Sequence, residues 1–274
     1  MGTIKMTWET YHTKGIKQKY VYRYVTIEKL IDFLETNSLF LSRLDKFEDN
    51  LENIEPYDIN ELKVRTQTLS KPEEANPEIS ETIWTQIIQN NKAELRAIQA
   101  KLTKQQKHRF VSCWILNDTE SFAMWDIYGK AGFAIRFERK YFQKLIKDSI
   151  SLQTEPTSKI DLVVAGIVQY QNFDKMLFKE QESSLKYSAF RKHQAFNHES
   201  EYRIIGFMKE ILEIPGLKYK LPDINELEFE LIANPRLDRF QFQKYSGIVS
   251  KYSEKHKLKE SELKIWLDFR NTNY

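Results

Sequence analysis

Short segments rich in Val, Ile, Leu and aromatic residues recur along the chain, and each has the length and composition of a β-strand. The stretches between them differ greatly in length, and helical patterns do not alternate strictly with the strands. Such an order disfavours a regular βαβ fold and predicts an α+β fold, with a central mixed or antiparallel sheet flanked by helices. The expected strands are 20–25, 39–42, 110–115, 132–137, 162–170, 200–207 and 227–233.

Helical patterns are clearest at residues 27–36 and 81–106. Thr26 can cap the first of these helices, and Asn37 is a plausible stop. In the second, apolar residues recur at alternating spacings of four and three, which predicts one long helix. Further helices are expected at 121–129, 174–194 and 238–258.

No clear domain boundary appears within residues 1–274, so we expect a single domain. The stretch 43–80 is polar and contains three prolines, and we interpret it as loop with short helices. With the long helix that follows, it predicts a helical insertion at residues 52–108. We favour a long helix that packs on the core. Asn91 in its apolar seam leaves open the alternative of a protruding arm or a dimer contact.

The composition allows a sizeable core and excludes several classes of protein. Hydrophobic residues make up 41% of the chain, which argues against global disorder. Cys113 is the single cysteine and cannot form an internal disulfide, which fits a reducing, cytoplasmic compartment. We find no apolar run of membrane-helix length and no signal peptide, so no membrane partner is expected. The net charge of +3 permits a nucleic-acid partner without requiring one.

Motifs for phosphate loops and metals are absent from the sequence. Neither GxGxxG nor GKS/GKT occurs, which removes the main support for Rossmann and P-loop folds. The five histidines lack zinc-ligand spacing, and a lone cysteine excludes paired-cysteine sites. The acidic run Asp45, Glu48, Asp49 and Glu52 lacks calcium-loop spacing, and we interpret it mainly as a solvated loop. No metal site is therefore predicted.

Two glutamates near the start of the strand 200–207 are candidate catalytic residues. If Ser200 begins the strand, Glu199 and Glu201 point to the same face, because side chains alternate with period two. Arg203 continues that face and can neutralise one carboxylate. Such a set can perform acid–base chemistry or stabilise a cation. Spacing alone favours the alternative of an exposed, salt-bridged strand face, because such triplets occur by chance.

Arg23 and an aromatic pair are candidate ligand-binding residues. Arg23 lies between tyrosines in a strand, and its planar guanidinium suits phosphate or carboxylate. Trp125 and Tyr128 are three residues apart on one helical face and could stack on a planar ring. The alternatives are an edge-strand arginine packed on its aromatic neighbours and a pair of core aromatics.

Several of these segments together resemble a bacterial family known only as domain of unknown function 2971. The likeness covers residues 22–52, 110–138, 190–207 and, more loosely, 231–249, in that order and with matching spacing. This chain departs from the family at 48–52, where Glu48-Asp49-Asn50-Leu51-Glu52 replaces an Asn-Asp-Pro-like turn. The family name implies no activity.

The chain also resembles small ADP-ribosyltransferases that act on nucleic acids. The resemblance lies in the strand Tyr22-Arg23-Tyr24-Val25, the helix pattern Leu30-Ile31-Asp32-Phe33-Leu34, the strand Leu39-Phe40-Leu41-Ser42, and Glu199-Ser200-Glu201 in the form Glu-x-Glu. It implies a split sheet with NAD as substrate.

Under this resemblance, each candidate residue has an expected role. Arg23 would hold the ribose or diphosphate of NAD, and Trp125 and Tyr128 would shelter the nicotinamide. Tyr24, Ser42 and Arg203 are further candidates for binding NAD. Glu201 would bond the ribose 2′-hydroxyl and stabilise the oxocarbenium-like transition state, while Glu199 would orient or deprotonate the acceptor.

The resemblance further implies a macromolecular acceptor, nucleic acid or protein, and a role in bacterial anti-phage defence or a toxin system. Two other functions remain open from the residues. One is a non-catalytic recognition module of a defence system. The other is a metal-dependent nuclease that would use Glu199, Glu201 and an acidic partner from 45–52. An aromatic cleft holding Arg23 and Glu201 would favour NAD, clustered carboxylates would favour a metal, and a filled core would favour the recognition module.

Overall fold

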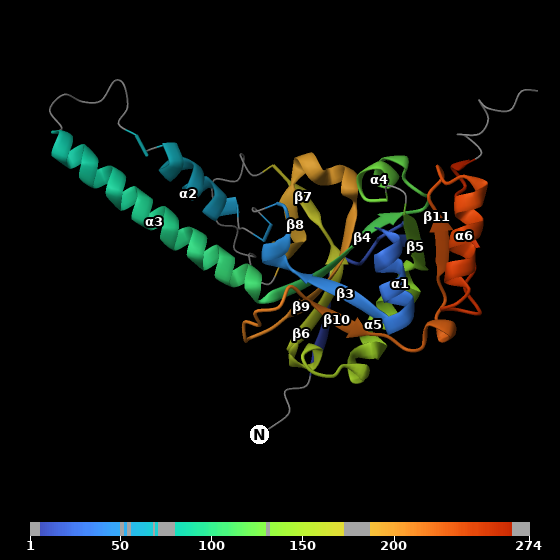
Figure 1. The fold of residues 1–274 in the computed structure, drawn as a ribbon. Coiled ribbons are helices and arrows are strands. Elements are labelled where there is room, and N and C mark those ends of the chain that lie inside the picture. The colour runs from blue at the N-terminus through green and yellow to red at the C-terminus, as the bar shows by residue number, and fades with distance from the viewer. Residues whose placement is uncertain are drawn as a thin grey trace, which may run out of the picture.

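A large mixed sheet forms the centre of the molecule (Figure 1). The structure, a computed structural model, describes residues 6–49, 52–53, 56–67, 69–70, 80–129, 132–172 and 187–264. Over these residues the main path is β1 (Thr7–Tyr11), β6 (Leu162–Ile167), β9 (Glu201–Phe207), β4 (Arg109–Asn117), β2 (Tyr20–Val25), β5 (Phe133–Glu138), β11 (Glu230–Ala233) and β12 (Leu258–Lys259). Only β1–β6 and β11–β12 are parallel pairs along this path. The predicted α+β fold is confirmed.

The sheet forks along β4. The first part of β4 pairs with β3 (Ser38–Arg43), where Ser42 lies opposite Val111, and β3 continues into β10 (Gly216–Lys220). The last part pairs with β2, where Tyr22 lies opposite Ile115. The middle of β4 therefore has no strand partner on this edge among the described residues, and β2 and β3 diverge there.

Helices cover one face of the sheet and bury the main core. These are α1 (Ile27–Thr36) and α5 (Arg139–Asp148), whose buried residues pack with Trp114 and other apolar residues of the sheet. The opposite face carries α4 (Phe122–Ile127) and several short 3₁₀ turns. As predicted, α1 begins after Thr26 and ends at Asn37, which adopts the left-handed conformation, although the Thr26 side chain makes no capping hydrogen bond.

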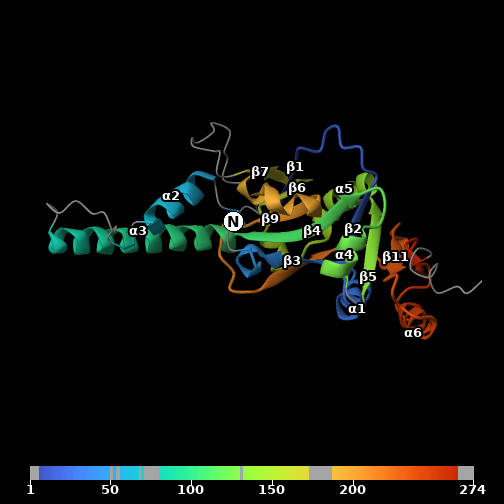
Figure 2. The ribbon, with the colours of Figure 1, turned by 90° about the horizontal axis from the view of Figure 1, so that it is seen from above.

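The helical insertion forms an arm. It consists of α2 (Pro56–Gln67) and α3 (Glu81–Lys107), and α3 projects from the body of the molecule (Figures 1 and 2). The buried residues of α3 are Leu95, Leu102 and Gln106, all in its second half, and Leu102 packs with Leu62 of α2 in a cluster separate from the main core. The structure thus has the protruding arm rather than the core-packed helix that we favoured.

Three element predictions need correction. The expected helix 174–194 is wrong over residues 187–194, which form the 3₁₀ turn Ser188–Phe190, the strand β8 (Arg191–His193) and the start of the turn Gln194–Glu199; residues 173–186 lie outside the described part. The single strand expected at 162–170 is split into β6 and β7 (Gln169–Gln171), and β7 pairs with β8. The last helix, α6 (Arg239–Val249), ends early because the chain turns back to place β12 beside β11.

Three further elements, β1, α5 and β10, were not predicted from the sequence. The helix α5 carries a strong amphipathic pattern with Phe142, Leu145 and Ile146 on its buried face, so the signal was present. No helix among the described residues is both long and apolar enough to cross a membrane.

Candidate functional site

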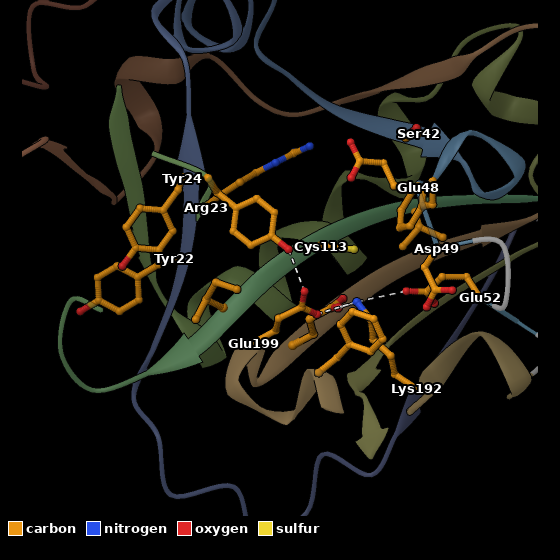
Figure 3. Close-up of a pocket in the computed structure, with 16 residues that line it drawn as sticks. Tyr22, Arg23, Tyr24, Ser42, Glu48, Asp49, Glu52, Cys113, Lys192 and Glu199 are labelled. Carbon is orange, nitrogen blue, oxygen red and sulfur yellow. Dashed lines mark hydrogen bonds and ion pairs between the residues drawn. The ribbon is translucent and has the colours of Figure 1, made fainter. Parts of the chain in front are cut away.

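A pocket of about 360 Å³ opens where the sheet forks (Figure 3). Its floor comes from β4, through Val111, Cys113 and Ile115, and its walls come from β2, β3 and the segments around β8 and β9. The side chains that contribute are Tyr22, Arg23, Tyr24, Ser42, Phe47, Glu48, Asp49, Glu52, Val111, Cys113, Ile115, Tyr128, Lys192, Phe196, Glu199 and Glu201.

Three carboxylates surround the ammonium group of Lys192 in this pocket. The Nζ atom lies 2.5 Å from Glu199 Oε2, 2.9 Å from Glu201 Oε1 and 3.2 Å from Glu52 Oε1. We call Glu52, Glu199 and Glu201 the carboxylate cluster. Lys192 is only 8% exposed, so this ammonium is largely removed from water. Figure 3 shows it between Glu199 and Glu52.

Arg203 supports the carboxylate cluster from below the pocket. Its Nε donates to Glu201 Oε2 at 2.6 Å, and Nη1 and Nη2 donate to the two oxygens of Glu52 at 2.8 and 2.9 Å. The predicted alternation along β9 places Glu201 and Arg203 on one face, which is how the pair meets. Because Arg203 is fully buried and does not line the pocket, it holds the carboxylates rather than a ligand.

The two glutamates of the Glu-x-Glu motif have opposite protonation tendencies. Burial alone would raise the pKa of Glu201, but Arg203 and Lys192 lower it well below its usual range. Burial and the neighbouring Glu201 carboxylate raise the pKa of Glu199, against the opposing effects of Lys192 and Tyr128. The Tyr128 hydroxyl donates to Glu199 Oε1 at 2.7 Å. The site therefore combines a more acidic carboxylate, Glu201, with a more basic one, Glu199.

Arg23 enters the gap between β2 and β3. Its Nη1 donates to Ser112 Oγ and its Nη2 to the Phe40 carbonyl, both at 3.0 Å. Both acceptors are neutral, and no ion pair of Arg23 occurs within the described ranges. Burial lowers its pKa. Since this half-buried cation has no counter-ion among the described residues, it could compensate the charge of an anionic ligand in the pocket.

The structure brings most of the predicted site residues together. Six of the eight line the pocket, namely Arg23, Tyr24, Ser42, Tyr128, Glu199 and Glu201. Arg203 acts behind it, as described. Trp125 is fully buried, packs edge-to-face on Tyr24 and donates from Nε1 to Glu120 at 2.9 Å. Its expected role against a bound ring is therefore not supported, because other core groups already surround the indole.

Sequence reasoning missed Lys192 and the structural role of Glu52. Lys192 fell inside an incorrectly predicted helix, and Glu52 was interpreted as part of a solvated loop, whereas it is only 1% exposed. No local pattern marks either residue. Glu52 meets Arg203 from 151 positions away, and Lys192 reaches Glu199 and Glu201 across a 3₁₀ turn that has no strand or α-helical period. Cys113 is at the pocket floor, where burial raises the pKa of its thiol well above the ordinary value.

Metal ligation is less favoured by this arrangement. Lys192 and Arg203 occupy the positions between the carboxylates where a cation would bind. Across the described residues, no group of three or more His, Cys, Asp or Glu side chains is suitably placed to hold a metal ion.

Comparison with known proteins gives one match. No curated protein and no solved structure is significantly similar to the chain. Residues 124–204 match the model of a family described as "Protein of unknown function (DUF2971)". That segment contains Tyr128, Lys192, Glu199 and Glu201 of the pocket wall and Arg203 behind it, whereas Arg23 lies outside the segment. Over these residues the match confirms the resemblance to this family that the sequence suggested.

Proposed function

We propose that the protein is an NAD-dependent ADP-ribosyltransferase-like enzyme that modifies a macromolecule. The observation that carries the proposal is that Arg23 and Glu201, from strands far apart in the sequence, line the same pocket. If Arg23 and Glu201 lay on opposite sides of the molecule, they could not bind one NAD molecule and the proposal would have no support. The volume of about 360 Å³ lies within the range of roughly 300–1,000 Å³ typical of small-molecule sites.

The charges of the pocket suit the charges of NAD. Arg23 offers an uncompensated cation on the β2 side, and the carboxylate cluster lies on the β9 side. NAD carries an anionic diphosphate and a cationic nicotinamide ring, so a ligand spanning the pocket would find both complements. Tyr24, Ser42 and Tyr128 supply the aromatic and hydroxyl groups of the walls.

The proposed reaction transfers ADP-ribose from nicotinamide to an acceptor. The C1′–N bond breaks and its electron pair passes to the nicotinamide nitrogen, which loses its positive charge. Glu201, held ionised by Arg203, stabilises the developing oxocarbenium charge at C1′. An acceptor oxygen or nitrogen then bonds to C1′, and its proton passes to Glu199, whose raised pKa makes it the stronger base. A place in bacterial defence or a toxin system belongs to the same proposal.

Nicotinamide release from NAD tests the proposal directly. We expect Glu201→Gln to reduce turnover by about 10²–10³-fold, because it removes one electrostatic contact made in the transition state. Glu199→Gln should leave hydrolysis by water measurable but impair transfer to the acceptor. Glu228→Gln, on the surface, is the matched control and should behave as wild type.

Each variant is first checked for cooperative unfolding, because Glu201 is buried against Arg203. Unchanged nicotinamide release by folded Glu201→Gln would reject the proposal, as would failure of the wild type to cleave NAD in the presence of both nucleic-acid and protein acceptors.

A further inference from the structure

The α3 helix carries a charge excess as large as that of the whole protein. It contains five Lys and Arg residues against two Glu residues, and the chain as a whole has a net charge of +3. The rest of the chain is thus balanced, and the positive excess is concentrated on the element that projects from the body (Figures 1 and 2).

Four of the five cations of α3 lie on one side of the helix, and Lys101 lies outside that side. At about 100° per residue, Lys92, Arg96, Lys104 and Lys107 fall within roughly a third of the circumference. We call these four residues the basic face. Leu95, Leu102 and Gln106 form the buried side, outside that sector. Lys92, Arg96 and Lys104 are exposed, and each is without an ion pair in the part of the chain that the structure describes, whereas Lys107 pairs with Glu213 at 3.0 Å.

The side chains between these cations are small or polar. Ala93, Ala97, Ala100 and Thr103 are exposed on the same side of α3. A stable protein–protein contact normally centres on buried aromatic or large aliphatic anchors, and the basic face has none. A phosphate backbone needs no such anchor, because cations and released counter-ions supply the affinity. The small residues let a backbone approach closely.

From these observations we propose that the basic face of α3 binds the phosphate backbone of a nucleic acid. The helix has 27 residues and is about 40 Å long, slightly more than one turn of a duplex. Of this length the basic face occupies residues 92–107, about 22 Å, and α3 projects from the body (Figure 2). Its exposed cations can therefore contact several consecutive phosphates.

The arm also connects to the pocket. The last turn of α3 leads directly into β4, which forms the pocket floor, and Gln106 Nε2 donates to the Glu52 carbonyl at 2.8 Å. The basic face therefore ends, at Lys107, in the turn of α3 that leads into the pocket floor. This identifies nucleic acid as the acceptor class, an assignment that rests on the proposed function, whereas the binding itself does not.

Measuring nucleic-acid binding in the absence of NAD, as a function of salt, tests the basic face separately from the proposed enzymatic activity. The probes are fluorescently labelled DNA duplexes and single strands of mixed sequence, each about 30 nucleotides long. Fluorescence anisotropy measures their binding constants over a range of KCl concentrations. The variant is Lys92→Gln/Arg96→Gln/Lys104→Gln, since glutamine keeps helix propensity. The control is Lys140→Gln/Lys144→Gln/Lys147→Gln on α5, which makes the same change in net charge on exposed lysines of the body.

Each phosphate contact contributes about 0.7–0.9 to the slope of log K against log salt concentration. The loss of three contacts should therefore make that slope shallower by roughly 2–3. The corresponding loss of affinity at 0.1 M salt is roughly 100-fold, and the α5 control should stay within a few-fold of wild type. No binding by the wild type at low salt would overturn the proposal. Equal losses in the two triple variants would do so too, because net charge alone would then explain the effect. Binding that persists while NAD is not cleaved would instead reject only the proposed enzyme.

Discussion

Replacing Lys192 by Met probes how the carboxylate cluster is held together. The Lys192 ammonium contacts three carboxylates within 3.2 Å and is almost excluded from water. Glu52 and Glu201 would keep Arg203 as a partner, but Glu199 would retain only the Tyr128 hydroxyl. Breaking a buried pair from one side typically costs about 3–5 kcal/mol. Because one carboxylate is left without a cation, we expect about 3 kcal/mol at pH 7.

This loss should depend on pH with a definite sign. Without Lys192 the pKa of Glu199, already raised by burial, rises further. An acid whose folded-state pKa exceeds the unfolded value favours the folded state at low pH, and that contribution is lost as pH rises through the folded-state pKa. The difference between variant and wild type should therefore be smaller at pH 5 than at pH 7.

Urea denaturation at both pH values measures these free energies of unfolding. The double variant Lys192→Met/Glu199→Gln should recover much of the stability, because it removes both the ammonium and the carboxylate left without it. Lys218→Met breaks an exposed ion pair with Asp32 and should cost less than about 1 kcal/mol. If Lys192→Met lost no more than this control, or lost equally at both pH values, our account of the cluster would be incorrect.

Two further changes test the site and its frame. Tyr128→Phe removes the hydroxyl that donates to Glu199, so the pKa of Glu199 should rise and the free energy of unfolding should fall by about 0.5–1.5 kcal/mol. An NMR titration of the labelled Glu199 carboxyl measures this pKa, and an unchanged pKa would contradict the assigned hydrogen bond. Gly166→Ala places a Cβ 2.4 Å from the Tyr11 carbonyl oxygen, so β1 must shift, and thermal unfolding should show a loss of about 1–3 kcal/mol. Gly247→Ala has no atom within 4 Å and should be neutral or stabilising, so equal effects of the two alanines would refute this packing.

The fold class followed from local patterns because strands and helices depend on short-range periodicity. Local patterns predicted the strand Tyr20–Val25, the helix Ile27–Thr36 and the end of this helix at Asn37. The region around Lys192 was not predicted, since its short strand exists only through pairing with β7. The position of α3 could not be predicted either, because an apolar seam on a helix can be covered by the core or by another helix.

Residue types alone determined which side chains could perform chemistry, and they singled out Arg23, Glu199 and Glu201. Only the tertiary structure decided that these three share a pocket, that Trp125 is a core residue, and that Lys192 and Glu52 complete the charge network. The physical reason is that ion pairs and burial depend on distances between distant segments. The forked sheet determines those distances, and the spacing of residues along the sequence does not predict them.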